Sequence, residues 1–245
     1  MRLGHLGKAL WPLLALTLAG CAGTRETPPA PKATAPAARP AEPDESPQLL
    51  TPPGLRLDAS VRPVRQAVTL ELDPRQETFR GTVDVELSLP EPTRVLWLHG
   101  EELEVKGAAF TVGAEREGAT VLPLGGMLAV LPRRPLGPGT VFLRMEYTGR
   151  AIAREGSGVF REEEAGRWYA MTQFQAQHAR RAFPCFDEPS FKIPWQLTLR
   201  VPEADAAFSN MPVEAEERGA DGWKTVRFRA TPPLPTYLVA FAVGP

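Results

Sequence analysis

The chain has 245 residues, of which 43% are hydrophobic, and its 28 basic and 29 acidic residues leave a formal net charge of -1. This composition is typical of a globular domain with an ordinary core, and no long run of basic residues marks a surface for nucleic acid, so we expect no nucleic-acid partner. Cys21 and Cys185 lie in segments of quite different character, which argues against a disulfide scaffold.

Residues 1–20 have the pattern of a signal peptide. Arg2 and Lys8 supply positive charge, an apolar run follows over residues 9–19, and small residues precede Cys21. The apolar run is shorter than the roughly 20 residues that a membrane-spanning helix needs. Its end, Leu-Ala-Gly-Cys, resembles the bacterial lipobox, in which the peptide is cleaved before the cysteine and the thiol is lipidated.

The lipobox resemblance implies that lipid on Cys21 anchors the chain to a membrane. Alanine follows the cysteine, where the familiar inner-membrane retention signal has aspartate. We therefore expect a lipid-anchored protein of the bacterial cell envelope, on the outer membrane. The alternative is an ordinary secretory signal peptide with a chance cysteine.

Residues 21–54 are predicted to be the lipidated cysteine and a disordered linker. Nine prolines lie between Pro28 and Pro53, mixed with Ala, Thr and Glu and with almost no large apolar side chains. Such a composition cannot bury enough surface to offset the entropy of ordering, and proline favours an extended chain of about 3.1 Å per residue. The linker would hold the folded domain up to roughly 100 Å from the lipid.

Residues 55–245 are predicted to form one all-β domain, a large antiparallel β-sandwich. Short runs alternate apolar and polar residues with a period of two, as half-buried strands do, and no stretch keeps a helical period beyond two turns. Gly- and Pro-rich groups separate the runs. The expected strands cover residues 68–72, 83–89, 94–98, 120–122, 127–131, 141–147, 195–201, 225–229 and 237–243.

One stretch, residues 169–189, departs from this alternation with the sequence YAMTQFQAQHARRAFPCFDEP. It is interpreted as a strand leading into a loop with paired charges, in which Arg180 or Arg181 can meet Asp187 or Glu188. The prolines of the stretch favour extended backbone in the residues before them.

This stretch resembles the N-terminal β domain of the aminopeptidase N and leukotriene-hydrolase type of zinc metallopeptidase. That family has a Thr-Gln-x-(Glu/Gln) strand followed by Ala-Arg-Arg-Ala-Phe-Pro-Cys-Phe-Asp-Glu-Pro, and the match is long and specific. Three further segments resemble the family, namely Leu96–His99, Glu155–Phe160 and Pro235–Gly244. The resemblance covers residues 60–245 and implies a saddle-like β domain.

The resemblance implies a substrate-binding role for Gln175, which stands at the family position that accepts hydrogen bonds from the free amino group of a peptide. Gln173 is expected to assist, because residues two apart on a strand face the same side. Many aminopeptidases have Glu where Gln175 stands, and the neutral amide resembles the leukotriene-hydrolase branch. The alternative is that both glutamines lie on a solvated strand face.

Other candidate residues are interpreted as structural. His99 and His178 have no partner at metal-ligand spacing, and Cys185 is expected to be a small buried thiol rather than a nucleophile. Asp187 and Glu188 are expected to hold the shape of the Arg-rich loop rather than to act as a pair of catalytic acids.

The family's zinc is held by a His-Glu-x-x-His helix and a second Glu, and the first Glu activates the metal-bound water. Only three histidines are present in this sequence, at positions 5, 99 and 178, so that helix is not among its 245 residues. The family's Gly-x-Met-Glu-Asn strand is also not among them. We therefore expect no catalytic residue and no bound zinc in this chain, and a catalytic domain that lies elsewhere.

Taken with the anchor, the resemblance predicts the N-terminal substrate-binding and structural domain of a membrane-anchored zinc metallo-aminopeptidase that removes N-terminal amino acids from peptides. The expected partners are peptide N-termini, the catalytic domain, and the membrane through the lipid on Cys21. The alternative is a non-catalytic surface lipoprotein that binds peptides or another partner. A third reading is a truncated reading frame with no selected role. The codons after Pro245 separate the first reading from the others.

Overall fold

The computed structural model of the chain describes residues 50–54, 56–57 and 60–245. The expected signal peptide, Cys21 and most of the expected linker lie outside the described residues. Within these ranges the helical elements are two short 3-10 turns, η1 (Ala179–Arg181) and η2 (Thr236–Leu238). No helix of the described residues is long and apolar enough to cross a membrane. The remaining regular structure is β, which confirms the predicted all-β class.

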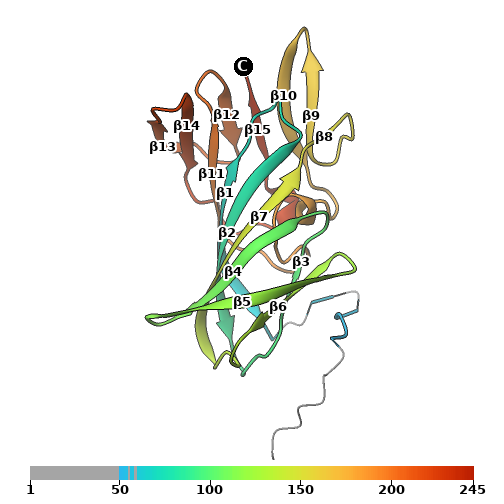
Figure 1. Cartoon of the computed structure of the whole chain (residues 1–245), viewed down its shortest axis with the longest axis vertical. Coiled ribbons are helices and arrows are strands. Elements are labelled where there is room, and N and C mark those ends of the chain that lie inside the picture. Colours follow the sequence, from blue (N-terminus) through green and yellow to red (C-terminus); the bar gives the residue numbers. More distant parts are fainter. Residues whose placement is uncertain (1–49, 55, 58–59) are drawn as a thin grey trace, which may run out of the picture. The chain divides into compact units, whose positions relative to one another are not determined.

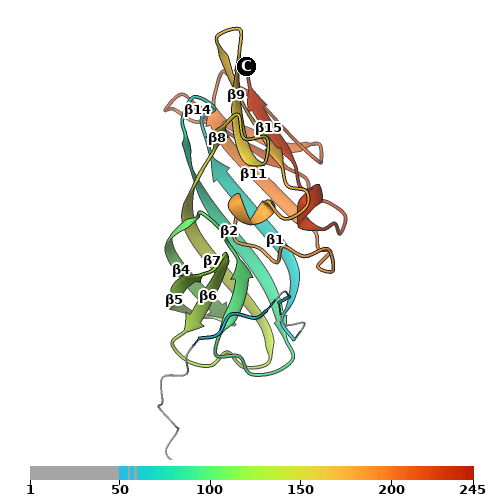
Figure 2. The same ribbon diagram turned by 90° about the vertical axis from the view of Figure 1, so that its right-hand side faces the viewer.

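Ten strands form one large sheet in the order β13-β14-β11-β1-β2-β7-β4-β5-β6-β3. Figures 1 and 2 both show β4, β5 and β6 at one end of the described unit and β9 and β15 of the second sheet at the other. The strands of the large sheet are β1 (Arg62–Glu71), β2 (Thr78–Leu89), β3 (Leu96–His99), β4 (Glu104–Val112), β5 (Glu115–Leu124), β6 (Met127–Pro132), β7 (Gly139–Arg150), β11 (Trp195–Pro202), β13 (Val213–Arg218) and β14 (Trp223–Phe228).

Five strands form a smaller sheet in the order β12-β15-β10-β9-β8. Its longest pairing joins β9 and β10 over seven residue pairs, with Gly158 opposite Gln173. The C-terminus of the chain lies at the end of the unit that carries β9, β10 and β15 (Figure 1). The strands are β8 (Ile152–Ala153), β9 (Gly158–Glu164), β10 (Arg167–Gln173), β12 (Ala206–Ser209) and β15 (Phe241–Gly244).

The hydrophobic core is built from the inward faces of both sheets, as the period-two pattern predicted. In β2, Val83, Val85 and Leu87 are buried while the residues between them are not. One close approach needs a glycine. Gly81 of β2 stands opposite Tyr147 of β7, and a Cβ added to Gly81 would lie 2.1 Å from the tyrosine ring. The missing side chain of Gly81 therefore makes room for the ring of Tyr147.

The antiparallel expectation holds for most strand pairs and fails for two. β1 pairs with β11 in parallel, and β8 pairs with β9 in parallel. The ten-stranded sheet is therefore mixed. Alternation of polarity fixes which face of a strand is buried, but it carries no information about the direction of the neighbouring strand.

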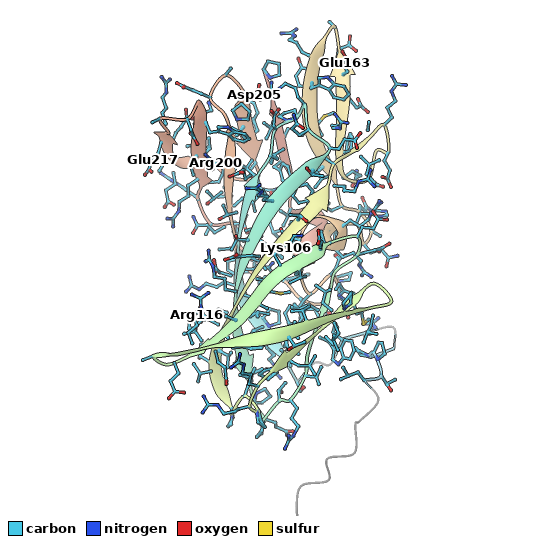
Figure 3. The ribbon with its side chains drawn as sticks, viewed as in Figure 1. Lys106, Arg116, Glu163, Arg200, Asp205 and Glu217 are labelled. Carbon is cyan, nitrogen blue, oxygen red and sulfur yellow. The ribbon has the colours of Figure 1, made fainter. Side chains whose placement is uncertain are left out.

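Several strands escaped the sequence pattern. β13 is an edge strand of the large sheet, and all six of its residues are exposed, so it has no buried face to mark it. Figure 3 shows Glu217 on this edge. The charged side chains on the open edge of β13 discourage pairing with another chain.

β4 carries a bulge between Val105 and Gly107, which interrupts the alternation of buried and exposed residues.

The expected last strand, residues 237–243, was too long at its N-terminal end. Residues 236–238 form η2, and β15 is confined to Phe241–Gly244. Pro235 precedes the turn with a φ of -73° and cannot donate a backbone hydrogen bond. Beyond the turn Val239, Phe241 and Val243 are buried, so these residues form the inward face of the segment.

Candidate functional site

The two glutamines singled out in the sequence lie where β10 ends. Gln173 is the last residue of the strand and Gln175 lies in the turn that follows, so strand alternation does not place them as expected. A hydrogen bond joins them instead, because the backbone N–H of Gln175 donates to Oε1 of Gln173 over 3.0 Å. Both residues are exposed. Within the described part of the chain, the side chain of Gln175 forms no hydrogen bond, so its amide is available to a ligand.

The turn is fixed from inside by an aromatic anchor. Phe174, between the two glutamines, is buried, and its ring meets that of Phe183 edge-to-face at 5.6 Å. The ring of Phe183 lies 5.5 Å from that of Trp195 on β11. The backbone N–H of His178 donates to the carbonyl of Phe174 over 2.9 Å and closes the turn. Buried aromatic rings thus hold the backbone that presents Gln173 and Gln175.

Behind the turn lies a buried polar group that we call the Asp187 cluster, made of His99, Arg180, Asp187 and Thr236. Nε of Arg180 donates to Oδ2 of Asp187 over 2.9 Å, and Oγ1 of Thr236 donates to Oδ1 over 2.5 Å. The backbone N–H of Asp187 donates to Nδ1 of His99 over 3.1 Å. Both carboxylate oxygens of Asp187 therefore have partners, as a buried charge requires. This confirms that Asp187 shapes the loop.

The cluster fixes the protonation state of its histidine. Nδ1 of His99 accepts a hydrogen bond, so the neutral ring carries its proton on Nε2. Burial lowers the pKa of His99 to about 4, helped by the positive charge of Arg180, while Asp187 works in the opposite direction. Burial also raises the pKa of the Cys185 thiol well above its usual range. His99 is thus a neutral hydrogen-bonding residue, and Cys185 is a buried thiol, as predicted.

The other charged residues of the loop make long-range contacts. Oε1 of Glu188 accepts a hydrogen bond from the backbone N–H of Leu57 over 2.6 Å, which ties the start of the domain to the loop. Of the alternative pairings that the sequence allowed, Arg180 with Asp187 is formed, and Arg181 contacts two other acids. Its guanidinium lies 2.5 Å from Oε1 of Glu155 and 2.8 Å from Oε2 of Glu102. Sequence spacing gave no sign of these partners, which precede Arg181 by 26 and 79 positions.

A pocket of about 470 Å³ adjoins the turn. Ala176 and Gln177 of the turn line it, together with His99, Arg180 and Asp187 of the cluster. The pocket thus has a polar wall that is already hydrogen-bonded. Gln173 and Gln175 are not among the residues that line it.

Zinc was expected only in a catalytic domain, and the residues described here do not fit it. Among residues 50–54, 56–57 and 60–245, no three His, Cys, Asp or Glu side chains come together as a metal-binding group. Nδ1 of His99 is already an acceptor for the N–H of Asp187, and Cys185 is a buried thiol with a raised pKa. We therefore derive no metal-dependent step from these residues.

Comparison with known proteins places the chain in a family. The family model described as the Peptidase M1 N-terminal domain matches residues 62–238. Aminopeptidase M1-A of Oryza sativa subsp. japonica is 39% identical over 202 residues, which are 77% of this chain and 23% of that protein. The thyrotropin-releasing hormone-degrading ectoenzyme of Rattus norvegicus is 31% identical over 221 residues, 85% of this chain and 20% of that protein.

A human relative is similar to the chain to a comparable extent. Endoplasmic reticulum aminopeptidase 1 of Homo sapiens is 32% identical over 201 residues, 78% of this chain and 21% of that protein. The chain thus spans about a fifth of the length of these relatives. The matched region contains the large sheet, the smaller sheet except β15, the Asp187 cluster and the turn with Gln173 and Gln175. The chain therefore belongs to the family of Peptidase M1 N-terminal domains.

Proposed function

We propose that this chain is the N-terminal substrate-binding and structural domain of a membrane-anchored zinc metallo-aminopeptidase, which removes N-terminal amino acids from peptides. The observation that carries the proposal is the exposed turn after β10. Gln175 presents an unpaired side-chain amide there, and the resemblance assigns this position to recognition of the substrate amino group. The aminopeptidase relatives support the same reaction class.

The chemistry of Gln175 suits an ammonium ligand. A peptide with a free N-terminus offers three N–H donors, and the amide oxygen of Gln175 is an acceptor with two lone pairs. A hydrogen bond to a charged group contributes about 1.5–3 kcal/mol, which corresponds to about tenfold to a hundredfold in affinity. Gln173 holds the backbone N–H of Gln175 and so fixes the start of the turn.

The rest of the enzyme is proposed to come from polypeptide outside these 245 residues. That part would supply the zinc, its ligands and the general base. One surface of the small sheet suits contact with such a partner. A pocket of about 400 Å³ is lined by Met171, Phe208, Phe241 and small or polar residues. Phe208 is 67% exposed there and Phe241 is buried, so Phe208 supplies the large apolar side chain that a partner would cover.

The proposed address is the bacterial cell envelope, with the domain held by lipid on Cys21. The support is the signal-peptide pattern and the Leu-Ala-Gly-Cys sequence alone. Cys21→Ser should release the protein from the membrane fraction or block its processing, because a hydroxyl cannot form the thioether. Membrane sedimentation and mass spectrometry of the N-terminal peptide measure this, and a variant that stays lipidated contradicts the proposed anchor.

The enzymatic proposal is tested on the protein expressed from its complete reading frame. We expect it to hydrolyse aminoacyl anilides and to reject the same substrates after N-acetylation, since acetylation removes the ammonium. Gln175→Ala should raise KM by about tenfold or more. The matched control is Gln177→Ala, two residues away and equally exposed.

Two outcomes contradict the proposal. Equal hydrolysis of free and acetylated substrates would separate the reaction from the N-terminus. A purified protein that binds peptides and never hydrolyses them would favour the alternative, a peptide-binding surface lipoprotein.

A further inference from the structure

Arg181 joins three segments that are distant in the sequence. Its backbone belongs to η1, directly after the turn that carries Gln175. Its guanidinium contacts Glu155, in the loop before β9, through Nη1 over 2.5 Å, and Glu102, in the loop after β3, through Nη2 over 2.8 Å. We call this arrangement of Arg181, Glu102 and Glu155 the Arg181 clamp.

The arginine of the clamp is more shielded than the arginine of a comparable arrangement. Arg134 also bridges two carboxylates, those of Glu115 and Glu117, but its side chain is 68% exposed. The side chain of Arg181 is 14% exposed, whereas those of Glu102 and Glu155 are 49% and 30% exposed. Exposed ion pairs contribute little because water and salt screen them, whereas a shielded arginine with two partners is held in one geometry. The hydrogen bond from Arg181 also lowers the pKa of Glu155.

The clamp is in direct contact with the turn and with the strand behind it. The backbone N–H of Arg181 donates to the carbonyl of His178, the last residue before η1, over 3.2 Å. Gly158 lies so close that an added Cβ would be 3.6 Å from Cβ of Arg181, and Gly158 is the partner of Gln173 in the β9–β10 pairing. With a φ of +67° it has the left-handed backbone that glycine favours.

We propose that Arg181 is a positioning residue for recognition of the substrate N-terminus. It fixes the outer side of the turn, from Gln173 to His178, against the loops of Glu102 and Glu155, while Phe174 fixes the inner side. Arg181 contacts no substrate in this role and acts through Gln175. The inference rests on the proposed function, because it names the residue that sets the site of that function.

The first test uses the 245-residue chain and needs no activity. Hydrogen exchange of the backbone amides from 174 to 182 is measured by mass spectrometry in wild type, Arg181→Gln and Arg181→Lys. We expect at least tenfold faster exchange in Arg181→Gln, and a value between the two in Arg181→Lys, whose single ammonium keeps the charge without the fork that reaches both carboxylates. The control Arg134→Gln removes the exposed two-carboxylate bridge and should leave these amides unchanged.

A charge-swapped variant protects this test against simple loss of folding. Arg181→Glu with Glu155→Arg restores an opposite-charge pair between η1 and the loop before β9 but leaves the introduced carboxylate facing Glu102, so exchange should return part of the way towards the wild-type rate. If Arg181→Gln exchanges like wild type, or if Arg134→Gln loosens the turn equally, Arg181 does not hold the turn and the proposal is overturned.

The second test uses the protein from the complete reading frame. We expect Arg181→Gln to raise KM for a free-amine anilide about tenfold with little change in kcat, because a displaced Gln175 loses binding energy that substrate and transition state share. A parallel loss of kcat with unchanged KM overturns the positioning role. If the wild-type protein hydrolyses nothing, the proposed function fails, and the exchange result still decides whether Arg181 holds the turn.

Discussion

The Asp187 cluster and the outer face of the large sheet use the same kind of ion pair in opposite surroundings. In the cluster, Arg180 lies 2.9 Å from Asp187, and the two side chains are 15% and 1% exposed. On the outer face, Arg144 of β7 lies 2.8 Å from Asp84 of β2, and these side chains are 46% and 50% exposed. The separations are nearly equal. Burial therefore decides how much each pair contributes, since water screens one and is excluded from the other.

The two regions also differ in how the pairs are supported. The cluster brings together residues from three distant parts of the chain, and each carboxylate oxygen of Asp187 has a donor. The outer face has pairs between neighbouring strands, and Figure 3 shows Arg200 among the charged side chains of this sheet. In the buried cluster, a group that loses its partner cannot bond to water instead, whereas a strand-to-strand pair on the surface can exchange its partner for water.

The largest effect is expected at the carboxylate of the cluster. Asp187→Ala should lower the free energy of unfolding by about 3–5 kcal/mol, because it leaves the guanidinium of Arg180 and the hydroxyl of Thr236 without their acceptor. Urea denaturation followed by tryptophan fluorescence measures the change. The matched variant Asp84→Ala, which removes the exposed carboxylate at a similar distance from its arginine, should cost about 1 kcal/mol or less.

Equal losses of unfolding free energy in Asp187→Ala and Asp84→Ala would contradict the comparison. They would show that burial does not change how much an ion pair contributes to stability. If Asp187→Ala is too unstable to purify, the variant Asp187→Asn keeps the shape of the side chain and reduces the loss. Asp187→Asn should still lower the free energy of unfolding more than Asp84→Asn does.

The second effect is a dependence of stability on pH that arises from the histidine of the cluster. The pKa of His99 is lowered from 6.5 to about 4 in the folded chain, so the unfolded chain binds a proton first as the pH falls. Stability is complete above pH 6.5 and is lost progressively as the pH falls towards 4, by about 3 kcal/mol from this residue. Urea denaturation at intervals between pH 7 and pH 4.5 measures the slope.

The variant His99→Gln isolates the contribution of His99 from that of all other groups. It keeps an acceptor for the N–H of Asp187 and cannot gain a proton in this range. Its unfolding free energy should vary less with pH than that of wild type. An identical slope in both proteins would mean that His99 is not the residue responsible.

A smaller effect is expected where the core buries a polar atom without a partner. Within the described residues, the hydroxyl of Tyr147 is buried and forms no hydrogen bond, and burial raises its pKa well above the usual range. Tyr147→Phe removes this hydroxyl and keeps the ring that fills the space over Gly81. The variant should be more stable by about 1 kcal/mol, because an unpaired buried polar group is unfavourable. Thermal unfolding measures the gain, and a loss of stability would point to a partner for the hydroxyl.

Sequence reasoning could find the strands with one buried face and the loop that carries the family pattern. It could place Asp187 in a structural role, because two arginines and two acids stood within nine positions. It could not find Thr236 as a partner of Asp187, or Glu102 as a partner of Arg181, because these contacts depend on how the two sheets are joined. Local alternation specifies burial along one strand and leaves long-range pairing open.

The candidate site shows the same limit of prediction from sequence. The resemblance indicated Gln173 and Gln175 by their positions in the motif, and strand periodicity then suggested that they share a face. The strand ends at Gln173, and the turn is held instead by the buried ring of Phe174. A motif identifies residues, but the backbone around them is decided by packing that the motif does not describe.

The smallest effect is expected on the outer face of the large sheet, where it tests the other side of the comparison. Asp84 and Arg144 face each other in the β2–β7 register and are hydrogen-bonded, yet about half of each side chain is exposed. Double-mutant cycles of such pairs give coupling energies of about 0.2–1 kcal/mol. From Asp84→Ala, Arg144→Ala and the double variant we expect a coupling energy of about 0.5 kcal/mol in low salt. This coupling energy should fall towards zero in 1 M salt, where the Debye length is about 3 Å.

A double-mutant cycle between Asp187 and Arg180 should keep most of its coupling energy under the same conditions, because salt does not reach a buried pair. If the coupling of the surface pair resists salt, it is shielded from solvent, and the contrast between the two regions is smaller than their exposures indicate.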